Sequence, residues 1–269
     1  MKLTDGVVVV TGAGSGIGRA TALAFATKGA RVAICDVDQP RLDTLAGELG
    51  DRLLLSRKVD VADRAQMELF ARDVHEHVPA VDVVVNNAGV AVGGTFLEVS
   101  LDDWDWIIGI NLRGVVHGCH FFVPKMVERK RGHVINISSI LGIYPAPALT
   151  AYVATKFAVL GMSQSLRVEL APHQIGVTAI CPGMINTQIV ADGRVRGQAG
   201  ERREKVKATF RKSGASPEVV AAAILDAVRT NPAVRTVGKD AAVIHALTRV
   251  APQLSMKLAS LAQKRFAAS

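Results

Sequence analysis

The feature that most constrains the fold is a short unit near the start of the chain, where an apolar run, a glycine-rich turn and a helical pattern follow one another. Residues 7–11 form a β-branched run with the length and composition of a buried parallel strand. The turn Gly12-Ala13-Gly14-Ser15-Gly16-Ile17-Gly18 comes next, and residues 19–29 carry apolar side chains at helical spacing. Strand, glycine turn and helix in this order form the context that a dinucleotide-binding site requires.

The glycine turn predicts contact with phosphate. Glycines let a backbone approach a pyrophosphate closely, and the amino terminus of a helix supplies free N–H groups and the positive end of the helix dipole. The residues predicted to bind the coenzyme here are Gly12, Ser15, Gly16, Ile17 and Gly18. A turn whose glycines serve only tight packing is the alternative.

A second β-branched run, residues 31–35, ends on Asp36, eighteen residues beyond Gly18. A carboxylate at this place can accept hydrogen bonds from the adenosine ribose hydroxyls, and it repels a 2′-phosphate. The sequence therefore predicts NAD rather than NADP as the coenzyme. Arg41 could supply a cation for that phosphate if the loop folded back, and Asp36 could instead serve only to form a turn.

Strand-like and helical patterns alternate along the rest of the chain, and such alternation requires a parallel sheet with right-handed crossovers. The predicted fold is α/β and Rossmann-type, a doubly wound, seven-stranded parallel sheet with helices on both faces. We expect one dinucleotide-binding domain over residues 1–240 and a helical extension over 241–269. Within the domain, residues 192–215 form a charged, weakly apolar stretch that reads as a lid beside the ligand edge, and we call it the lid segment.

Tyr152 and Lys156 stand four residues apart in a predicted helix over 151–171, so both reach the same small volume. A neighbouring ammonium favours phenolate, which would make Tyr152 a usable acid/base. Ser139 follows the apolar run 133–137, and a strand ending there places its hydroxyl at the carboxyl edge of the sheet. A solvated i,i+4 pair is the alternative for Tyr152 and Lys156.

Composition limits the classes of function. Of 269 residues, 49% are hydrophobic and 21% charged, which is typical of an ordered globular chain. The net charge of +8 lies in the last third: residues 194–212 and 229–269 each carry a local charge of +6. The basic regions lack the interleaved aromatic residues of a nucleic-acid platform, so no nucleic acid is expected. An anionic substrate and a solvated helical face are two explanations for the basic lid segment.

The three cysteines, Cys35, Cys119 and Cys181, are far apart and lack metal-ligand spacing, so buried thiols and no metal site are expected. The longest uncharged stretch, residues 134–155, is interrupted by polar residues and prolines, which argues against a membrane-spanning helix. We predict a soluble, cytoplasmic protein.

The extension over 241–269 carries an apolar stripe, Leu254, Leu258 and Leu261, and Pro252 should kink or begin its helix. Packing on its own domain, an intersubunit clamp, a wall of the substrate pocket and peripheral contact with an anionic membrane are the alternatives, and the membrane contact is the least expected.

Several motifs occur in one order along residues 5–240. They are the Thr-Gly-x-x-x-Gly-x-Gly turn, Asp36, Asp60-Val61, Asn86-Asn87-Ala88-Gly89, Asn111, Ser139, Tyr152, Lys156 and Pro182-Gly183. In these motifs the chain closely resembles the single-domain short-chain dehydrogenase/reductase family.

The resemblance implies roles by position. Tyr152 would exchange the proton, Ser139 would hold the substrate oxygen, and Lys156 would bind the nicotinamide ribose and lower the pKa of Tyr152. Asn111 would hold a water that links Lys156 to solvent. The remaining implied coenzyme contacts are Asp60 and Val61 at the adenine, Asn87 near the ribose, and Ile185 and Thr187 at the nicotinamide amide.

The implied function is an NAD-dependent oxidoreductase that interconverts a secondary alcohol and a ketone. A homodimer or homotetramer is the family's expectation. The substrate walls are predicted in residues 91–97, 140–150 and 184–215, whose apolar members suggest a bulky hydrophobic substrate: Phe96, Leu141, Ile143, Tyr144, Leu149 and Met184. A dinucleotide-binding sensor without turnover is the alternative class.

Overall fold

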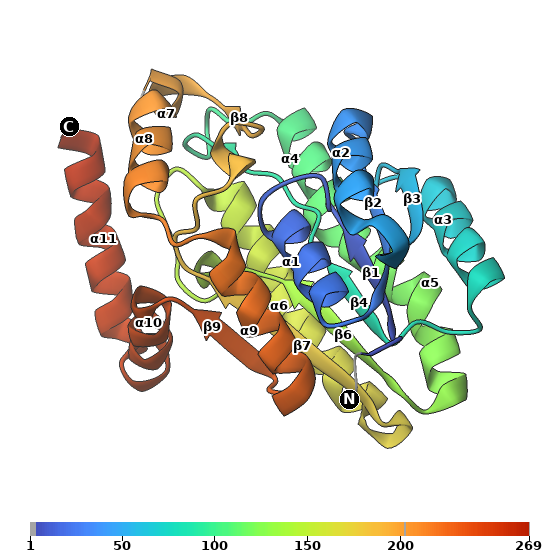
Figure 1. The fold of residues 1–269 in the computed structure, drawn as a ribbon. Helices are drawn as coiled ribbons and strands as arrows, with labels where there is room; N and C mark the ends of the chain where they lie inside the picture. Colours follow the sequence, from blue (N-terminus) through green and yellow to red (C-terminus); the bar gives the residue numbers. More distant parts are fainter. Residues whose placement is uncertain (1–3, 202, 269) are drawn as a thin grey trace.

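The computed structural model describes residues 4–201 and 203–268, so Arg202 of the lid segment and Ser269 of the extension lie outside the described residues. Seven parallel strands form the central sheet, in the order β3-β2-β1-β4-β6-β7-β9. Their bounds are β1 Val7–Thr11, β2 Arg31–Asp36, β3 Leu53–Lys58, β4 Val83–Asn86, β6 Gly132–Ile137, β7 Ile175–Pro182 and β9 Val234–Val237. The predicted Rossmann-type sheet is confirmed (Figure 1).

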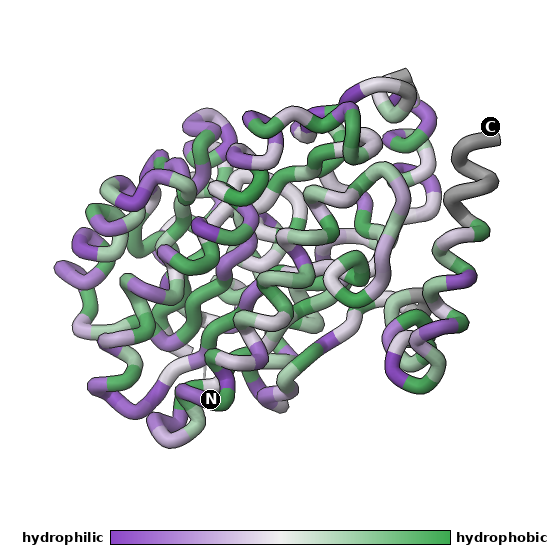
Figure 2. The backbone as a smooth tube through the Cα atoms, turned by 180° about the vertical axis from the view of Figure 1, so that it is seen from behind, coloured by the Kyte–Doolittle hydropathy of each residue, from purple (hydrophilic) through white to green (hydrophobic). Residues whose placement is uncertain are grey.

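Helices cover both faces of this sheet. Their bounds are α1 Gly16–Thr27, α2 Gln39–Leu49, α3 Arg64–His77, α4 Leu101–Ile108, α5 Gly114–Arg129, α6 Thr150–Leu170 and α9 Pro217–Thr230. Helices α1, α2 and α9 pack on one face and α3, α5 and α6 on the other. Figure 2 shows the hydrophobic residues running along the chain inside this arrangement, with hydrophilic residues on the outer helical turns.

The pleat of the strands explains why one sheet has two cores. Val7 and Val9 of β1 belong to the core under α3, α5 and α6, whereas Val8 and Val10 belong to the core under α1, α2 and α9. Successive side chains of a strand point to opposite faces, so a strand covered on both sides must be apolar throughout. The continuous valine run is therefore the sequence signature of a central strand.

The strand order places the ligand edge. From β1 the chain first adds β2 and β3 on one side, and it then returns to add β4, β6, β7 and β9 on the other side. The loops after β1 and β4 therefore diverge, and a crevice opens between them at the carboxyl ends of the strands.

The helical region over residues 101–129 consists of three parts. Helix α4 passes through a π-helical turn, Gly109–Arg113, into α5, and Asn111 lies in that turn. A π-turn interrupts the regular hydrogen bonding of a helix and often occurs at functional sites. Asn111 therefore lies at a local departure from the α-helix.

The lid segment folds into β8 Arg194–Val195, α7 Gly197–Glu201 and α8 Arg203–Ser213, and β8 pairs with β5, Val92–Gly93. Two further helices follow the sheet, α10 Lys239–Val250 and α11 Pro252–Ala268. Pro252 begins α11, as predicted. In Figure 1, α11 runs along the edge of the molecule beyond α10.

The apolar stripe of α11 stays in solvent. Leu254, Leu258 and Leu261 are 50%, 43% and 55% exposed, whereas Ser255 and Ala259 on another side of the helix are buried. Within residues 4–201 and 203–268, no helix combines the length and apolar character needed to cross a membrane. The three cysteines are buried and unpaired with one another, as predicted.

Candidate active site

A cleft of about 810 Å³ opens at the carboxyl edge of the sheet. Most of the predicted site residues line it: Gly12, Ser15, Gly16, Ile17, Asp36, Asp60, Val61, Asn87, Ser139, Tyr152, Lys156, Ile185 and Thr187. Gly18 and Asn111 are the two predicted residues that lie behind its wall. Segments far apart in the sequence thus meet in one cavity, as their positions at strand ends predict.

The glycine turn has no room for side chains. A methyl group added to Gly12, whose φ is +61°, would lie 2.7 Å from the Ala88 Cα, and one added to Gly18 would lie 2.1 Å from the Gly12 carbonyl oxygen. The turn leads into α1, whose first residues carry no acidic side chain and whose N-cap, Ser15, makes no side-chain capping bond. The turn therefore exposes its backbone and the free N–H groups at the amino terminus of α1, and both can bind the pyrophosphate of a dinucleotide.

The turn is fastened to the end of β4. Asn87 Nδ2 donates to the carbonyl oxygens of Thr11 and Gly12, both at 2.9 Å. Thr11 Oγ1 accepts the backbone N–H groups of Asn87 and Ala88 at 3.0 and 3.1 Å. Asn87 therefore fixes the shape of the turn from behind, besides lining the cleft. The Thr11 hydroxyl, which the sequence interpretation did not single out, is its partner.

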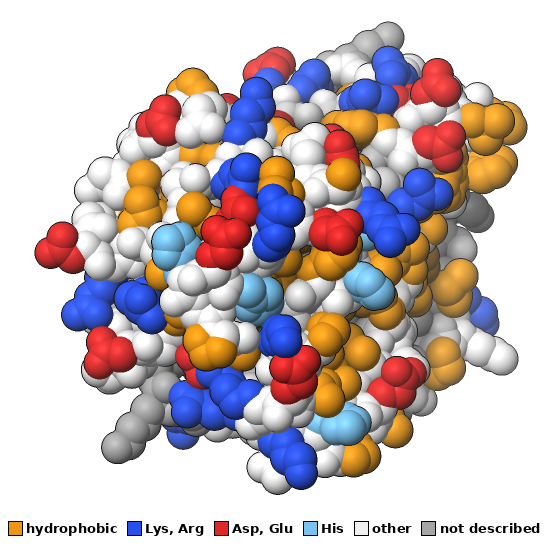
Figure 3. Space-filling model, turned by 90° about the vertical axis from the view of Figure 1, so that its right-hand side faces the viewer, with side chains coloured by type: hydrophobic (Ala, Val, Ile, Leu, Met, Phe, Trp, Pro, Cys, Tyr) orange, Lys and Arg blue, Asp and Glu red, His pale blue; other side chains and the backbone are white. Residues whose placement is uncertain are grey.

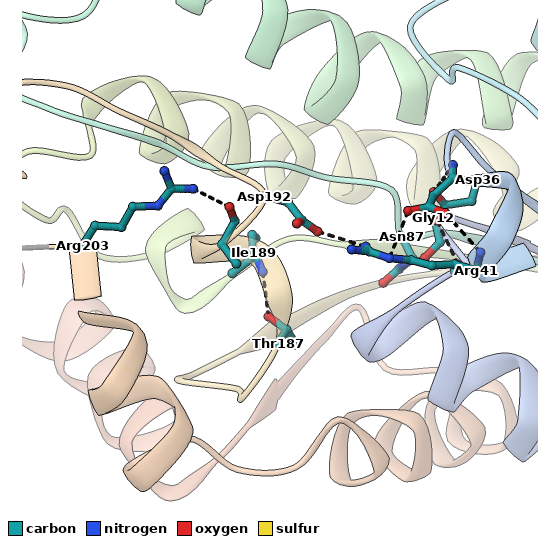
Figure 4. Close-up of polar contacts among 11 residues, drawn as sticks. Gly12, Asp36, Arg41, Asn87, Thr187, Ile189, Asp192 and Arg203 are labelled. Carbon is teal, nitrogen blue, oxygen red and sulfur yellow. Dashed lines mark hydrogen bonds and ion pairs between the residues drawn. The ribbon is translucent and has the colours of Figure 1, made fainter. Parts of the chain in front are cut away.

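The Asp36 carboxylate lies where the sequence predicts, at the end of β2. It accepts the Gly14 N–H at 2.8 Å and the Asp38 N–H at 3.1 Å, and it lines the cleft. Arg41, from the first turn of α2, lies next to it (Figure 4). The guanidinium of Arg41 pairs with Asp38 and, across the cleft, with Asp192 of the lid segment.

Tyr152 and Ser139 meet on the other side of the cleft. Ser138 Oγ donates to the Lys156 carbonyl oxygen at 2.8 Å, which joins the end of β6 to α6 and places Ser139 beside Tyr152. Burial raises the pKa of Tyr152 to about 12, and the Ser139 hydroxyl opposes that rise by hydrogen bonding.

The structure does not show the predicted lowering of the Tyr152 pKa by Lys156, which stays a prediction. Lys156 Nζ lies 5.6 Å from the centre of the Tyr152 ring and donates to the Ile137 carbonyl oxygen at 2.9 Å. Burial lowers the pKa of Lys156 itself to about 8. Desolvation is the largest cause of both shifts because both side chains are buried.

Asn111 has a structural partner that the sequence did not reveal. Its Oδ1 accepts the Val90 N–H at 2.8 Å, and its Nδ2 donates to the Val90 carbonyl oxygen at 2.9 Å and to Thr155 Oγ1 at 3.2 Å. These bonds tie the π-turn to the loop after β4 and to α6. A methyl group on Gly89 would lie 3.4 Å from both Asn111 Oδ1 and Lys156 Nζ, so these two atoms face one small space.

The substrate walls agree only partly with the prediction. Leu141, Leu149 and Met184 line the cleft. Phe96 instead packs edge-on against Trp104, with ring centres 6.2 Å apart, and Ile143 and Tyr144 are not among the lining residues. The lid segment supplies Val195, Val206 and Phe210, which lie within the predicted range 184–215, whereas Trp106 of α4 is an apolar wall that sequence reasoning missed. Among the described residues none beyond Phe210 lines the cleft, so the described part of the extension forms no pocket wall.

One ion-pair cluster braces this wall. Asp103 of α4 is fully buried, and it accepts hydrogen bonds from Arg196 Nε and Nη2, both at 2.8 Å, and from Arg194 Nη1 at 3.2 Å. The Arg194 guanidinium also lies 4.0 Å from the centre of the Trp106 ring. The arginines hold the pKa of Asp103 far below its usual range. Two of the basic lid residues are therefore structural.

Comparison with known proteins agrees with this geometry. The sequence pattern described as short chain dehydrogenase matches residues 6–198, most of the chain. The chain belongs to the short-chain dehydrogenase family. A solved short chain dehydrogenase/reductase from Burkholderia phymatum, in complex with NAD, superposes with a TM-score of 0.87 at 27% identity and covers 94% of this chain and 96% of that one.

Two relatives from Mycobacterium tuberculosis align over nearly the whole chain. "Probable oxidoreductase EphD" is 38% identical over 266 residues, which are 96% of this chain and 45% of that protein. The chain thus spans about half the length of this relative. A second protein, named SadH, is 36% identical over 267 residues, 97% of this chain and 96% of its own length. The fold and these relatives agree with membership of the short-chain dehydrogenase family.

Proposed function

We propose that this protein is an NAD-dependent oxidoreductase that interconverts a secondary alcohol and a ketone, with Tyr152 as the acid/base. The observation that carries the proposal is the meeting of two sets of residues in one cleft. The glycine turn and Asp36 form one end, and Ser139, Tyr152 and Lys156 form the other. The proposed chemistry needs a dinucleotide and a proton-exchanging hydroxyl to face the same substrate.

The bound nicotinamide coenzyme would supply the hydride acceptor or donor. The chain's own residues would bind the substrate hydroxyl and exchange its proton. Ser139 would hold the substrate oxygen by a hydrogen bond, and Tyr152 would take the hydroxyl proton as the carbonyl forms. Burial of both side chains, 8% and 9% exposed, excludes bulk water from the exchange.

Lys156 and Asn111 would complete the proton route. Lys156 Nζ and Asn111 Oδ1 both face the space beside Gly89, which supports a water held between them. Lys156 Nζ would also bind the nicotinamide ribose. A bound coenzyme and substrate would bring the phenol of Tyr152 into the range where it exchanges a proton.

The preference for NAD rests on Asp36. Its carboxylate is fixed by two backbone N–H groups and stands at the cleft, where the ribose hydroxyls would donate to it. Arg41, the nearby cation, is paired with two carboxylates. The relative from Burkholderia phymatum, solved with NAD, is consistent with this choice.

The substrate would be bulky and hydrophobic. The walls around Ser139 and Tyr152 are apolar, with Leu141, Leu149 and Trp106 among them. An anionic substrate has less support than the sequence alone suggested, because Arg194 and Arg196 are engaged by Asp103 and Lys207 pairs with Glu204. Those pairs explain part of the basic lid segment without a ligand.

The decisive test compares the two tyrosines of the chain. Tyr152→Phe should lower kcat for oxidation of secondary alcohols by at least about 100-fold, because general acid–base catalysis contributes about 10²–10⁴-fold. NADH binding should stay within about twofold, since the phenol is not at the phosphate cradle. Tyr144→Phe, outside the cleft lining, is the matched control. Near-normal turnover in Tyr152→Phe would refute the assigned acid/base.

Nothing in the described residues favours the alternative of a sensor without turnover, because Ser139, Tyr152 and Lys156 all line the cleft. A cytoplasmic location is supported by the three buried, free cysteines.

We also propose a homodimer or homotetramer through α5 and α6, whose exposed hydrophobic side chains include Val116, Phe157 and Val168. Figure 3 shows hydrophobic side chains between histidine and charged ones on the face that lies on the right in Figure 1. Sedimentation analysis would measure the state.

A further inference from the structure

The Arg41 side chain begins at the predicted adenosine end of the cleft. A methyl group on Gly14 would lie 3.0 Å from both Arg41 Cβ and Asp36 Oδ2, so the base of the Arg41 side chain lies near the Asp36 carboxylate. An arginine in such a place can bind a phosphate with two parallel N–H bonds. Arg41 is therefore the residue that could bind a 2′-phosphate beside Asp36 by donating hydrogen bonds to it.

Two carboxylates direct Arg41 elsewhere. Its Nη1 lies 3.1 Å from Asp192 Oδ2, and its Nε lies 3.1 Å from Asp38 Oδ2. Asp38 is local, since it caps the same helix and accepts the Arg41 N–H. Asp192 is 151 residues away and belongs to the lid segment on the facing wall. Figure 4 shows the Arg41 side chain extended toward Asp192.

The lid backbone holds Asp192 in place. The Asp192 N–H donates to the Gln188 carbonyl oxygen at 2.8 Å. The next carbonyl oxygen, that of Gly193, accepts Arg203 Nη2 at 3.2 Å, and a methyl group on Gly193 would lie 2.8 Å from the Ala91 carbonyl oxygen. Arg194 is then bound to Asp103. The carboxylate is thus presented by a braced segment.

We propose that Asp192 is a second determinant of coenzyme choice, acting by holding the Arg41 guanidinium away from the 2′ position of the adenosine ribose. NAD can bind without disturbing the Arg41–Asp192 pair, whereas a 2′-phosphate gains a cation only when the pair breaks. The inference rests on the proposed function, because it requires a nicotinamide coenzyme in this cleft. It goes beyond Asp36, which acts by its own charge.

The test is a titration of the whole protein with NADH and NADPH, followed by coenzyme fluorescence. Asp192→Asn keeps the shape of the side chain and removes its charge. The Kd for NADPH should fall about threefold to fivefold, which matches the free energy of one exposed ion pair. The Kd for NADH should change less than about twofold.

Two variants control the result. Arg41→Gln removes the proposed phosphate ligand, so adding Asp192→Asn to it should give no gain for NADPH. Asp226→Asn breaks ion pairs with Arg229 and Arg235 on a part of the chain that does not line the cleft, and it should alter neither Kd.

An unchanged NADPH Kd in Asp192→Asn, or a gain that persists without Arg41, would overturn the inference. If the wild type still binds NADH in that case, the proposed function stands. Failure of the wild type to bind either coenzyme would overturn both.

Discussion

Loss of the Asp103 carboxylate should release the lid segment without unfolding the protein. Asp103 is fully buried and joins α4 to β8 through three hydrogen bonds from Arg194 and Arg196. The pairing of β8 with β5 is only two residues long, so the strand ladder alone holds this segment weakly. Asp103→Asn keeps the side-chain size and removes the charge that both guanidiniums share.

The magnitude follows from burial and exposure. Breaking a fully buried ion pair costs about 3–5 kcal/mol. Here Arg194 and Arg196 are 40% and 47% exposed, so water would solvate them after release, and we expect about 2 kcal/mol. That corresponds to a roughly 30-fold larger equilibrium constant for opening of the β5–β8 pair, and so to roughly 30-fold faster hydrogen exchange there.

Hydrogen exchange read by mass spectrometry measures this opening. Peptides that cover residues 90–95 and 192–197 should exchange faster in Asp103→Asn, while peptides from β1 and β4 should not. Asp102→Asn is the control, because Asp102 shares the first turn of α4 but is exposed. Equal exchange in the two variants, or faster exchange throughout the sheet, would refute a local clamp.

Three further predictions concern the turn, the core and the proton route. Gly18→Ala should weaken NADH binding more than tenfold, because its methyl group would lie 2.1 Å from the Gly12 carbonyl oxygen. Gly47→Ala is the control, since open space surrounds Gly47, and it should bind NADH normally. Denaturant unfolding should show that Gly47→Ala gains about 0.5–1 kcal/mol of stability. Burial lowers the pKa of His133 to about 4, so below pH 6.5 the unfolded chain binds more protons than the folded chain. The free energy of unfolding should therefore fall by up to about 3 kcal/mol as the pH drops from 6.5 to 4. This loss should vanish in His133→Gln. Because the pKa of Tyr152 lies near 12, kcat/KM for alcohol oxidation should rise with pH above neutrality, and a flat profile would contradict the phenolate base.

The sequence was sufficient for the parts of this protein that depend on local pattern. The valine run of β1 had to be a central strand, because successive side chains point to opposite faces of the sheet and all of them are apolar. Asp36 and Ser139 had to lie at the carboxyl edge, because each follows a strand directly. Tyr152 and Lys156 had to share a direction, because they are one helical turn apart. For the same reason most predicted site residues line one cleft.

Only the tertiary structure decided the contacts between segments that no spacing relates. Asp103 meets Arg196 across 93 residues, and Arg41 meets Asp192 across 151. The amide of Asn111 is used by the Val90 backbone, which no periodicity indicates. The pKa of Tyr152 rises because the fold buries the phenol, although the i,i+4 lysine suggested the opposite. Charge neighbours can be read from sequence when they are local, whereas desolvation and long-range ion pairs exist only after the chain has packed.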